Sequence, residues 1–409
     1  MKKMRFSRLV TLLALFAALG AAIPVLAEET IKVGILGPFT GSLAFNAGEM
    51  KKGMLLALDE VNDQGGLFGQ KVELLFGDTE AKPEPGMAAV KKLVTRDKVL
   101  VVGGGYASSV NIVTSEFCHY EQCPVVVAIA ISPTITERGY EYVFRTSPTS
   151  PMFLEGINRW MADVKKPKTV AFFMENSDYG RDGEKIWEAQ CNKIGAKVAA
   201  KLYFEIGDTD FTSPISKLKN LAPDVVFNIA STTEAALIQK QARELNFVTQ
   251  WIGVGGQFTQ AFFEMTGPTS EFAMGSSLEP TKAMKDPVTA AFVNAYIKKY
   301  PESRPGIFSS QGYDNLAVIL DAIKRAGKPT GDLAKDRQRI RDALAATDMK
   351  LSQGHVRFGK DGQVADIIPS VVQVQLGEKC KPDTQIIYPA ERAVTEYQVP
   401  KPWDQRRCK

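Results

Sequence analysis

Two adjacent serines, Ser108 and Ser109, are the residues whose type and position point most directly to binding chemistry. They follow an apolar stretch at 99–102 and a triple-glycine turn at 103–105, and they stand where the next helix should begin. A helix N-terminus presents free backbone N–H groups and partial positive charge, so this position suits an anion such as a carboxylate. The alternative is that both serines only cap the helix.

Catalytic chemistry finds little support in the sequence. A Ser-His-Asp triad would have to use His119 or His355, and neither accompanies a Gly-x-Ser-x-Gly elbow. The turn at 103–105 resembles a phosphate loop but lacks the Lys-Ser/Thr pair of a nucleotide site. Two histidines without a Cys-x-x-Cys motif make no zinc pattern. We therefore expect no enzymatic activity, no cofactor and no metal.

The elements that must position these residues alternate between strands and helices. Residues 31–36 form an apolar strand, 47–62 carry an apolar helical stripe, and 72–76 form a second strand, which together make a βαβ unit. Glycine-bounded strands and helices continue to about residue 148, and a second such series follows from 170 to 254. This pattern is typical of parallel sheets covered on both faces, and two series predict two α/β lobes.

The C-terminal third has a different pattern. We expect helices at about 287–299, 309–326 and 333–345. A hairpin is then predicted between 355–358 and 371–375. The last segment, 380–409, is rich in proline and charge and should wrap the surface.

The N-terminus predicts export. Four basic residues are followed by an apolar run from Leu9 to Val25 and by the small–x–small sequence Val25-Leu26-Ala27, so 1–27 reads as a cleaved signal peptide. The alternative is an uncleaved anchor, but the run is just under the roughly 20 residues of a membrane span. Without these residues the formal charge falls from +4 to 0, with 50 − 4 = 46 basic against 46 acidic residues. The mature protein is expected in a bacterial periplasm, with no nucleic-acid partner.

Export also permits disulfide bonds. Cys118 and Cys123 are close enough to join a helix end to the next strand, and Cys380 and Cys408 could tie down the tail. Cys191 would remain as a buried apolar residue on a helix. Spacing alone leaves the connectivity open.

A set of short motifs carries a family resemblance that covers the mature chain to about residue 375. In this order and spacing they closely resemble the leucine/isoleucine/valine-binding proteins, the type I periplasmic solute receptors of bacterial ABC importers. The motifs are Gly37-Pro-Phe-Thr-Gly41, Asp63-Gln-Gly-Gly66, Asp78, Ser108-Ser109, Pro133, Arg138-Gly-Tyr140, Phe144-Arg-Thr146 and Asp178-Tyr-Gly180.

The resemblance implies a fold of two Rossmann-like lobes with a ligand cleft between them, joined by three crossing segments near 149, 276 and 350. Ligand would close the lobes by a hinge motion. The first lobe would comprise 28–148 and 276–349, the second 149–275 and 350–379, with 380–409 as a C-terminal tail.

The family's cleft residues can be carried over position by position. In the family the positions of 105–109 and 128–132 hold the ligand's carboxylate, and Tyr179 and Phe308 match cleft aromatics. Asn46 replaces a large aromatic, and Ser231 replaces a tyrosine. The implied ligand-binding residues are Asn46, Tyr106, Ala107, Ser108, Ser109, Ile129, Ala130, Ile131, Tyr179, Ser231, Gly255 and Phe308.

Gly255 is the departure with the largest consequence, because it replaces the acidic residue that pairs with the ligand's ammonium group in amino-acid-binding members. A buried ammonium without its carboxylate loses roughly 3–5 kcal/mol, or about two to three and a half orders of magnitude in affinity. Either Glu234, Glu175 or Asp178 supplies the charge, or the ligand has no amine. We expect Glu175 to be exposed at a strand end. Because the residues at 46, 231 and 255 leave a wider pocket with fewer partners for a positive charge, we slightly favour an amine-free acid over a hydrophobic amino acid.

The expected function is therefore the substrate-binding component of an ABC importer. It would capture a branched-chain or other hydrophobic amino acid, or an amine-free aromatic or organic acid, as a monomer, and deliver it to permease subunits in the inner membrane. The alternative is a sensory receptor of the same fold that reports to a regulator or a chemoreceptor.

Overall fold

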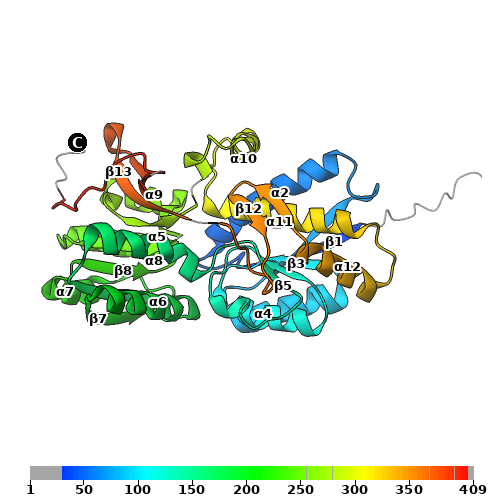
Figure 1. Cartoon of the computed structure of the whole chain (residues 1–409), viewed down its shortest axis with the longest axis horizontal. Helices are drawn as coiled ribbons and strands as arrows, with labels where there is room; N and C mark the ends of the chain where they lie inside the picture. Colours follow the sequence, from blue (N-terminus) through cyan, green and yellow to red (C-terminus); the bar gives the residue numbers. More distant parts are fainter. Residues whose placement is uncertain (1–29, 255, 279, 368, 391, 404–409) are drawn as a thin grey trace, which may run out of the picture.

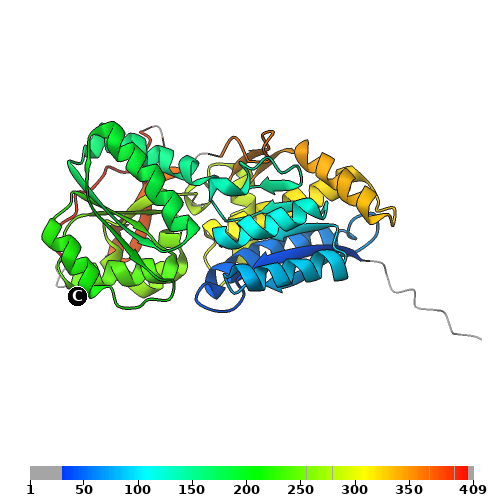
Figure 2. The same cartoon turned by 90° about the horizontal axis from the view of Figure 1, so that it is seen from below.

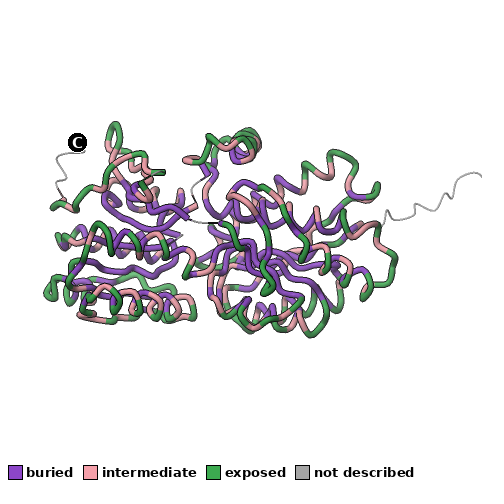
Figure 3. The backbone as a smooth tube through the Cα atoms, viewed as in Figure 1, coloured by how far each residue is buried: buried purple, intermediate pink, exposed green. Residues whose placement is uncertain are grey.

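The computed structural model describes residues 30–254, 256–278, 280–367, 369–390 and 392–403, and the chain forms two α/β lobes that lie side by side (Figures 1 and 2). The predicted signal peptide at 1–27, Gly255 and Cys408 lie outside these residues. Each lobe is built on its own sheet, and buried backbone runs through both sheets (Figure 3).

The first sheet has five parallel strands in the order β2-β1-β3-β4-β5. Its side chains alternate between two apolar clusters: Val101 packs toward α2 and α11, whereas Val102 packs toward α3 and α4. This alternation buries both faces, as expected for a parallel sheet. The elements are β1 (Ile31–Gly37), α2 (Ala44–Asp63), β2 (Val72–Asp78), α3 (Pro83–Lys91), β3 (Val101–Gly104), α4 (Ser108–Tyr120), β4 (Val125–Val127) and β5 (Val143–Arg145), with α10 (Pro287–Lys299), α11 (Ile307–Ala326) and α12 (Leu333–Ala345) added later in the chain.

The second sheet has seven strands in the order β14-β13-β10-β9-β8-β6-β7. The five strands from β10 to β7 are parallel, and β13 and β14 extend the edge as antiparallel strands. Phe172 packs toward α5 and α6, and its neighbour Phe173 packs toward α7, α8 and α9. The elements are α5 (Ser150–Trp160), β6 (Thr169–Glu175), α6 (Asp178–Ile194), β7 (Lys197–Phe204), α7 (Thr212–Leu221), β8 (Val225–Ile229), α8 (Thr232–Glu244), β9 (Gln250–Val254), α9 (Gln260–Thr266), β10 (Met274–Ser277), β13 (Ser370–Leu376) and β14 (Pro382–Tyr388).

Short helical turns complete the described part of the chain. They are η1 (Lys92–Arg96), η2 (Pro133–Ile135), η3 (Met161–Lys165), η4 (Gly256–Phe258), η5 (Gly267–Ser270), η6 (Pro280–Lys282) and η7 (Glu378–Cys380).

The predicted hairpin between 355–358 and 371–375 is wrong. Strand β12 (Gly354–Arg357) pairs instead with β11 (Asp348–Leu351), and β13 pairs with β10 and β14. Asp314 on α11 accepts hydrogen bonds from the backbone N–H groups of Ser352 and Gln353, both at 3.0 Å, which holds the β11–β12 turn on the first lobe.

The third crossing therefore comes later than residue 350. The backbone of Arg145 at the end of β5 donates to Gly362 and accepts from Val364. The chain then reaches the second sheet at β13. The predicted surface tail is also different, because β14 continues this sheet beyond residue 380.

The predicted Cys118–Cys123 disulfide is absent, and both cysteines are free and buried. The Sγ of Cys123 lies 3.9 Å from the carbonyl oxygen of Pro124, and both thiols pack in the apolar cluster beneath α3 and α4. Burial raises the pKa of the Cys123 thiol to about 12. Cys191 is buried on α6 as predicted, while Cys380 is disulfide-bonded.

No helix among the described residues is long and apolar enough to cross a membrane. Likewise, the described part of the chain contains no group of three or more His, Cys, Asp or Glu side chains suited to a metal ion.

Candidate functional site

A cavity that is partly open to solvent lies between the lobes, at the carboxyl ends of strands from both sheets. The loops after β3 and β4 form its first-lobe wall, and the ends of β6, β8 and β9 form the opposite wall. Ligands of open α/β sheets bind at such carboxyl ends. Ten residues predicted from the resemblance line this cavity: Tyr106, Ala107, Ser108, Ser109, Ile129, Ala130, Ile131, Tyr179, Ser231 and Phe308.

Glycines shape the turn that leads from β3 into the cavity. Gly104 and Gly105 have φ angles of +86° and +90°, which side-chain-bearing residues rarely adopt. A Cβ atom on Gly105 would also lie 2.0 Å from the Oδ1 atom of Asn111. The turn therefore requires glycine, and it places the N-terminus of α4 at the cavity wall.

The two serines do not cap α4. Its N-cap residue is Ala107, and no side chain accepts a hydrogen bond at that cap. The hydroxyl of Ser108 instead accepts a hydrogen bond from the backbone N–H of Ser132, at 3.3 Å. The free end of the helix dipole at Ala107–Ser109 is therefore directed at the cavity, where it favours an anion.

Arg145 is buried in the first lobe and fixes the backbone of the neighbouring wall segment, residues 130–132. Its buried guanidinium donates to the carbonyl oxygens of Ala130 and Ser132, at 3.2 and 2.6 Å, and to the side chains of Thr136 and Gln363. Burial lowers the pKa of Arg145 to about 9. This residue positions the backbone of 130–132 and is no part of the cavity lining.

Glu175 lines the second-lobe wall, so the expectation that it is exposed is wrong. It ends β6 and is only 4 % exposed. Its Oε1 accepts a hydrogen bond from the Ser177 hydroxyl at 2.6 Å, and its Oε2 accepts from the N–H and hydroxyl of Ser231 at 3.2 and 3.0 Å. Burial raises the pKa of Glu175, with a further contribution from the nearby Glu234 carboxylate.

The other two candidate acids are placed differently. Asp178 is exposed, whereas Glu234 is buried on α8 and accepts a hydrogen bond from the backbone N–H of Gly207 at 2.8 Å. The second Glu234 oxygen, Oε2, has no hydrogen-bond partner among the described residues. No lysine, arginine or histidine is among the residues described as lining the cavity.

Aromatic rings close the apolar part of the site. Tyr106 and Phe308 meet edge to face, with ring centroids 5.3 Å apart. Burial and the Glu175 carboxylate raise the pKa values of Tyr106 and Tyr179, so both phenols stay neutral. Ile131, Ile206 and Val254 add further apolar surface.

Asn46, a predicted ligand-binding residue, is not among the described residues that line the cavity. Its side chain donates to the Tyr106 hydroxyl at 2.7 Å and accepts from the hydroxyl of Thr232 on the second lobe at 3.2 Å. Asn46 therefore links the lobes behind Tyr106.

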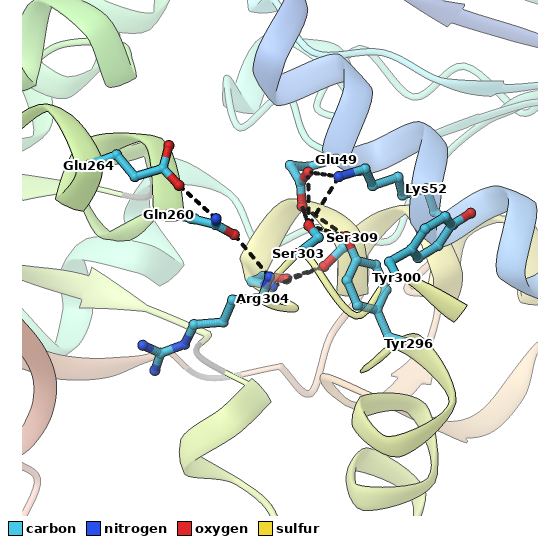
Figure 4. Close-up of polar contacts among 10 residues, drawn as sticks. Glu49, Lys52, Gln260, Glu264, Tyr296, Tyr300, Ser303, Arg304 and Ser309 are labelled. Carbon is cyan, nitrogen blue, oxygen red and sulfur yellow. Dashed lines mark hydrogen bonds and ion pairs between the residues drawn. The ribbon is translucent and has the colours of Figure 1, made fainter. Parts of the chain in front are cut away.

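Two further contacts join the lobes at the rim. The hydroxyl of Ser132 donates to the Asp182 carboxylate on α6. The backbone N–H of Arg304 donates to Oε1 of Gln260 on α9, at 2.9 Å (Figure 4). These contacts belong to a closed arrangement of the two lobes.

The loop that carries Arg304 is itself anchored to the first lobe. Glu49 on α2 accepts from the Tyr296 hydroxyl and from Lys52, both at 2.9 Å, and contacts Ser303 (Figure 4). This buried cluster fixes the loop immediately before the cavity residues Ile307 and Phe308.

Several lining residues were not predicted as such from the sequence. Glu175 was a candidate acid expected to be exposed, and Ser177 was not considered, although both follow a predicted strand and the rule that ligands bind at carboxyl ends could have identified them. The remaining apolar ones carry no local signal, because their positions depend on lobe packing. They are Leu43, Phe153, Ile206, Ala230, Val254, Gly256 and Ile307, together with the polar Gln311.

Comparisons with known proteins agree with this geometry. The sequence model described as periplasmic binding protein matches residues 30–376. The leucine-, isoleucine-, valine-, threonine- and alanine-binding protein of Pseudomonas aeruginosa is 28% identical over 357 residues, which cover 87% of this chain and 93% of that protein. A Leu/Ile/Val-binding protein homolog of Brucella abortus is 26% identical and covers 92% of this chain and 95% of its own.

Solved structures show the same fold. The branched-chain amino acid transporter substrate binding protein LivJ of Streptococcus pneumoniae, in complex with isoleucine, superposes with a TM-score of 0.78 at 24% identity, covering 88% of this chain and all of its own. A solute binding protein of an ABC transporter from Rhodopseudomonas palustris, in complex with benzoate, superposes with a TM-score of 0.77 at 20% identity. The match covers 87% of this chain and 95% of that protein. The resemblance to the leucine/isoleucine/valine-binding proteins and the predicted type I fold are confirmed.

Proposed function

Because the chain belongs to the periplasmic binding protein family, we propose that it captures a small carboxylate-bearing solute by lobe closure and delivers it to the membrane permease of an ABC importer. The observation that carries this proposal is the uncapped N-terminus of α4 at the wall of the interlobe cavity. It offers backbone and serine donors to a carboxylate. ATP hydrolysis would belong to the partner, and this chain would do no chemistry.

The apolar part of the cavity supports a hydrophobic solute. Phe308, Ile131 and Val254 surround the space beyond the anion position. The solutes named for the relatives, which include leucine, isoleucine and benzoate, all combine a carboxylate with an apolar group. A branched-chain or other hydrophobic amino acid and an amine-free acid both satisfy this description.

A thermal-shift screen of the mature protein tests the proposal, since a ligand that binds only the folded state raises the unfolding midpoint. Amino acids and amine-free acids are compared with leucinamide, which lacks the carboxylate. We expect a concentration-dependent rise with at least one small hydrophobic carboxylate and none with leucinamide. An equal rise with leucinamide, or no rise with any carboxylate, would contradict the proposal.

A further inference from the structure

The second-lobe wall carries two buried carboxylates that no cation among the described residues pairs with. Glu175 and Glu234 are 4 % and 1 % exposed, and neither forms an ion pair with any residue that the structure describes. Burial and the nearby Glu234 carboxylate also disfavour the charged state of Glu175. Buried carboxylates without a cation are costly, so a site of this kind favours a positively charged group from outside the chain.

The hydrogen bonds of Glu175 leave one acceptor position for such a group. An ionised carboxylate has about four acceptor positions on its two oxygens. Ser231 fills both positions on Oε2 of Glu175, whereas Ser177 fills one on Oε1. One position on Oε1, at the cavity wall, receives no donor from the described residues, and the Oε2 atom of Glu234 likewise has no hydrogen-bond partner among them.

The three hydrogen-bond donors already present also fix the orientation of the Glu175 carboxylate. Each of them is a hydroxyl or N–H group that donates to the carboxylate, so together they hold it in one orientation as an acceptor. A fourth donor that carries positive charge completes the set, and an ammonium group supplies both the hydrogen and the charge.

We propose that Glu175 is the ammonium partner of the ligand, which makes the cargo a zwitterionic hydrophobic amino acid. The ligand's carboxylate would lie at the N-terminus of α4 on the first lobe and its ammonium at Glu175 on the second. Closure then brings both ends of one small molecule into contact with opposite lobes. This inference rests on the proposed function and reverses the preference for an amine-free acid.

In this proposal Glu175 supplies the negative charge that is missing at Gly255. In the amino-acid-binding relatives that this chain resembles, the acid at that position follows β9, whereas Glu175 ends β6, on the other side of β8 in the sheet. The charge is thus supplied from another strand end of the same sheet, two strands away. Glu234 adds a second, deeper negative charge behind it.

The test uses ligand pairs that differ only in the amine. Calorimetry with leucine and 4-methylpentanoate, and with phenylalanine and 3-phenylpropanoate, is performed on the wild type, on Glu175→Gln and on the control Glu244→Gln, an exposed residue at the end of α8. We expect the wild type and the control to bind the better amino acid about 100-fold or more tighter than its amine-free partner. Glu175→Gln should lose most of that preference and keep its affinity for the amine-free acid.

The outcomes separate the two proposals. If the wild type binds amine-free acids as tightly as amino acids, or if Glu175→Gln keeps the preference, the Glu175 assignment is wrong while the proposed function stands. If no carboxylate binds at all, the proposed function fails as well. The wild-type comparison needs no variant, so a folding defect in Glu175→Gln would not leave the assignment without a test.

Discussion

The hydrogen bond between Ser132 and Asp182 gives a direct measure of what lobe closure contributes to binding. Ser132 follows β4 on the first lobe, and Asp182 lies on α6 of the second. The Ser132 hydroxyl is buried in this contact, while Asp182 is partly exposed. Because the contact joins the two lobes, it should form only when they close around ligand.

Its magnitude follows from its chemistry. A hydrogen bond to a charged group contributes about 1.5–3 kcal/mol, and partial exposure of Asp182 reduces this to about 1–1.5 kcal/mol. Ser132→Ala removes the hydroxyl and leaves the carboxylate free to contact water. Since 1.4 kcal/mol corresponds to tenfold, the variant should bind ligand roughly 5- to 10-fold more weakly.

The assay is calorimetric titration of Ser132→Ala, Asp182→Ala and the double variant with the same ligand. If the bond alone carries the effect, the second substitution should add almost nothing to the first. Ser216→Ala, which removes an exposed hydroxyl on α7, should leave the affinity unchanged. Unchanged affinity in Ser132→Ala, or fully additive losses in the double variant, would refute the reasoning.

Three further predictions address the site and the fold. Ser109→Ala should weaken an amino acid and its amine-free partner by the same factor, about 5-fold for one hydrogen bond, in calorimetry; an effect on only one of them would contradict carboxylate binding at α4. Phe308→Ala should lower the free energy of unfolding by about 3 kcal/mol in urea titrations, because the buried ring packs on Tyr106, and an unchanged midpoint would contradict that packing. Burial raises the pKa of Asp314 from its ordinary 3.8 to about 7, so its contribution to stability is complete below pH 3.8 and is lost as the pH rises through 7. The wild type should therefore lose stability relative to Asp314→Asn between pH 4 and 7, by roughly 4 kcal/mol, and parallel unfolding midpoints across this range would contradict it.

Local constraints explain which parts of the site could be predicted from the sequence. The turn at 103–109 and the segment 129–131 depend on glycines, a strand end and a helix start that lie close together in the chain, so pattern and resemblance place them correctly. The position of Glu175 at the end of a predicted strand is consistent with the cavity edge, but its burial could not be predicted from local sequence. That burial depends on Ser231, which is 56 positions away and follows the adjacent strand β8, and on the approach of the first lobe.

The same reason explains the errors in the fold. The residues at 355–358 and 371–375 both suit strands, but local pattern does not reveal their partners. The carboxylate of Asp314 holds the β11–β12 turn on the first lobe, and this contact spans 38 positions of sequence. Likewise, the five-residue spacing of Cys118 and Cys123 permits a disulfide, yet the Cys123 thiol contacts the Pro124 carbonyl.

A crystal structure of the mature protein with the tightest ligand of the screen tests the central claim most directly. The account predicts one ligand molecule in the interlobe cavity, with its carboxylate at the N–H groups and hydroxyls of Ser108 and Ser109 and its ammonium at Glu175. A ligand bound outside this cavity, or bound within it with its carboxylate away from the α4 N-terminus, would contradict the account.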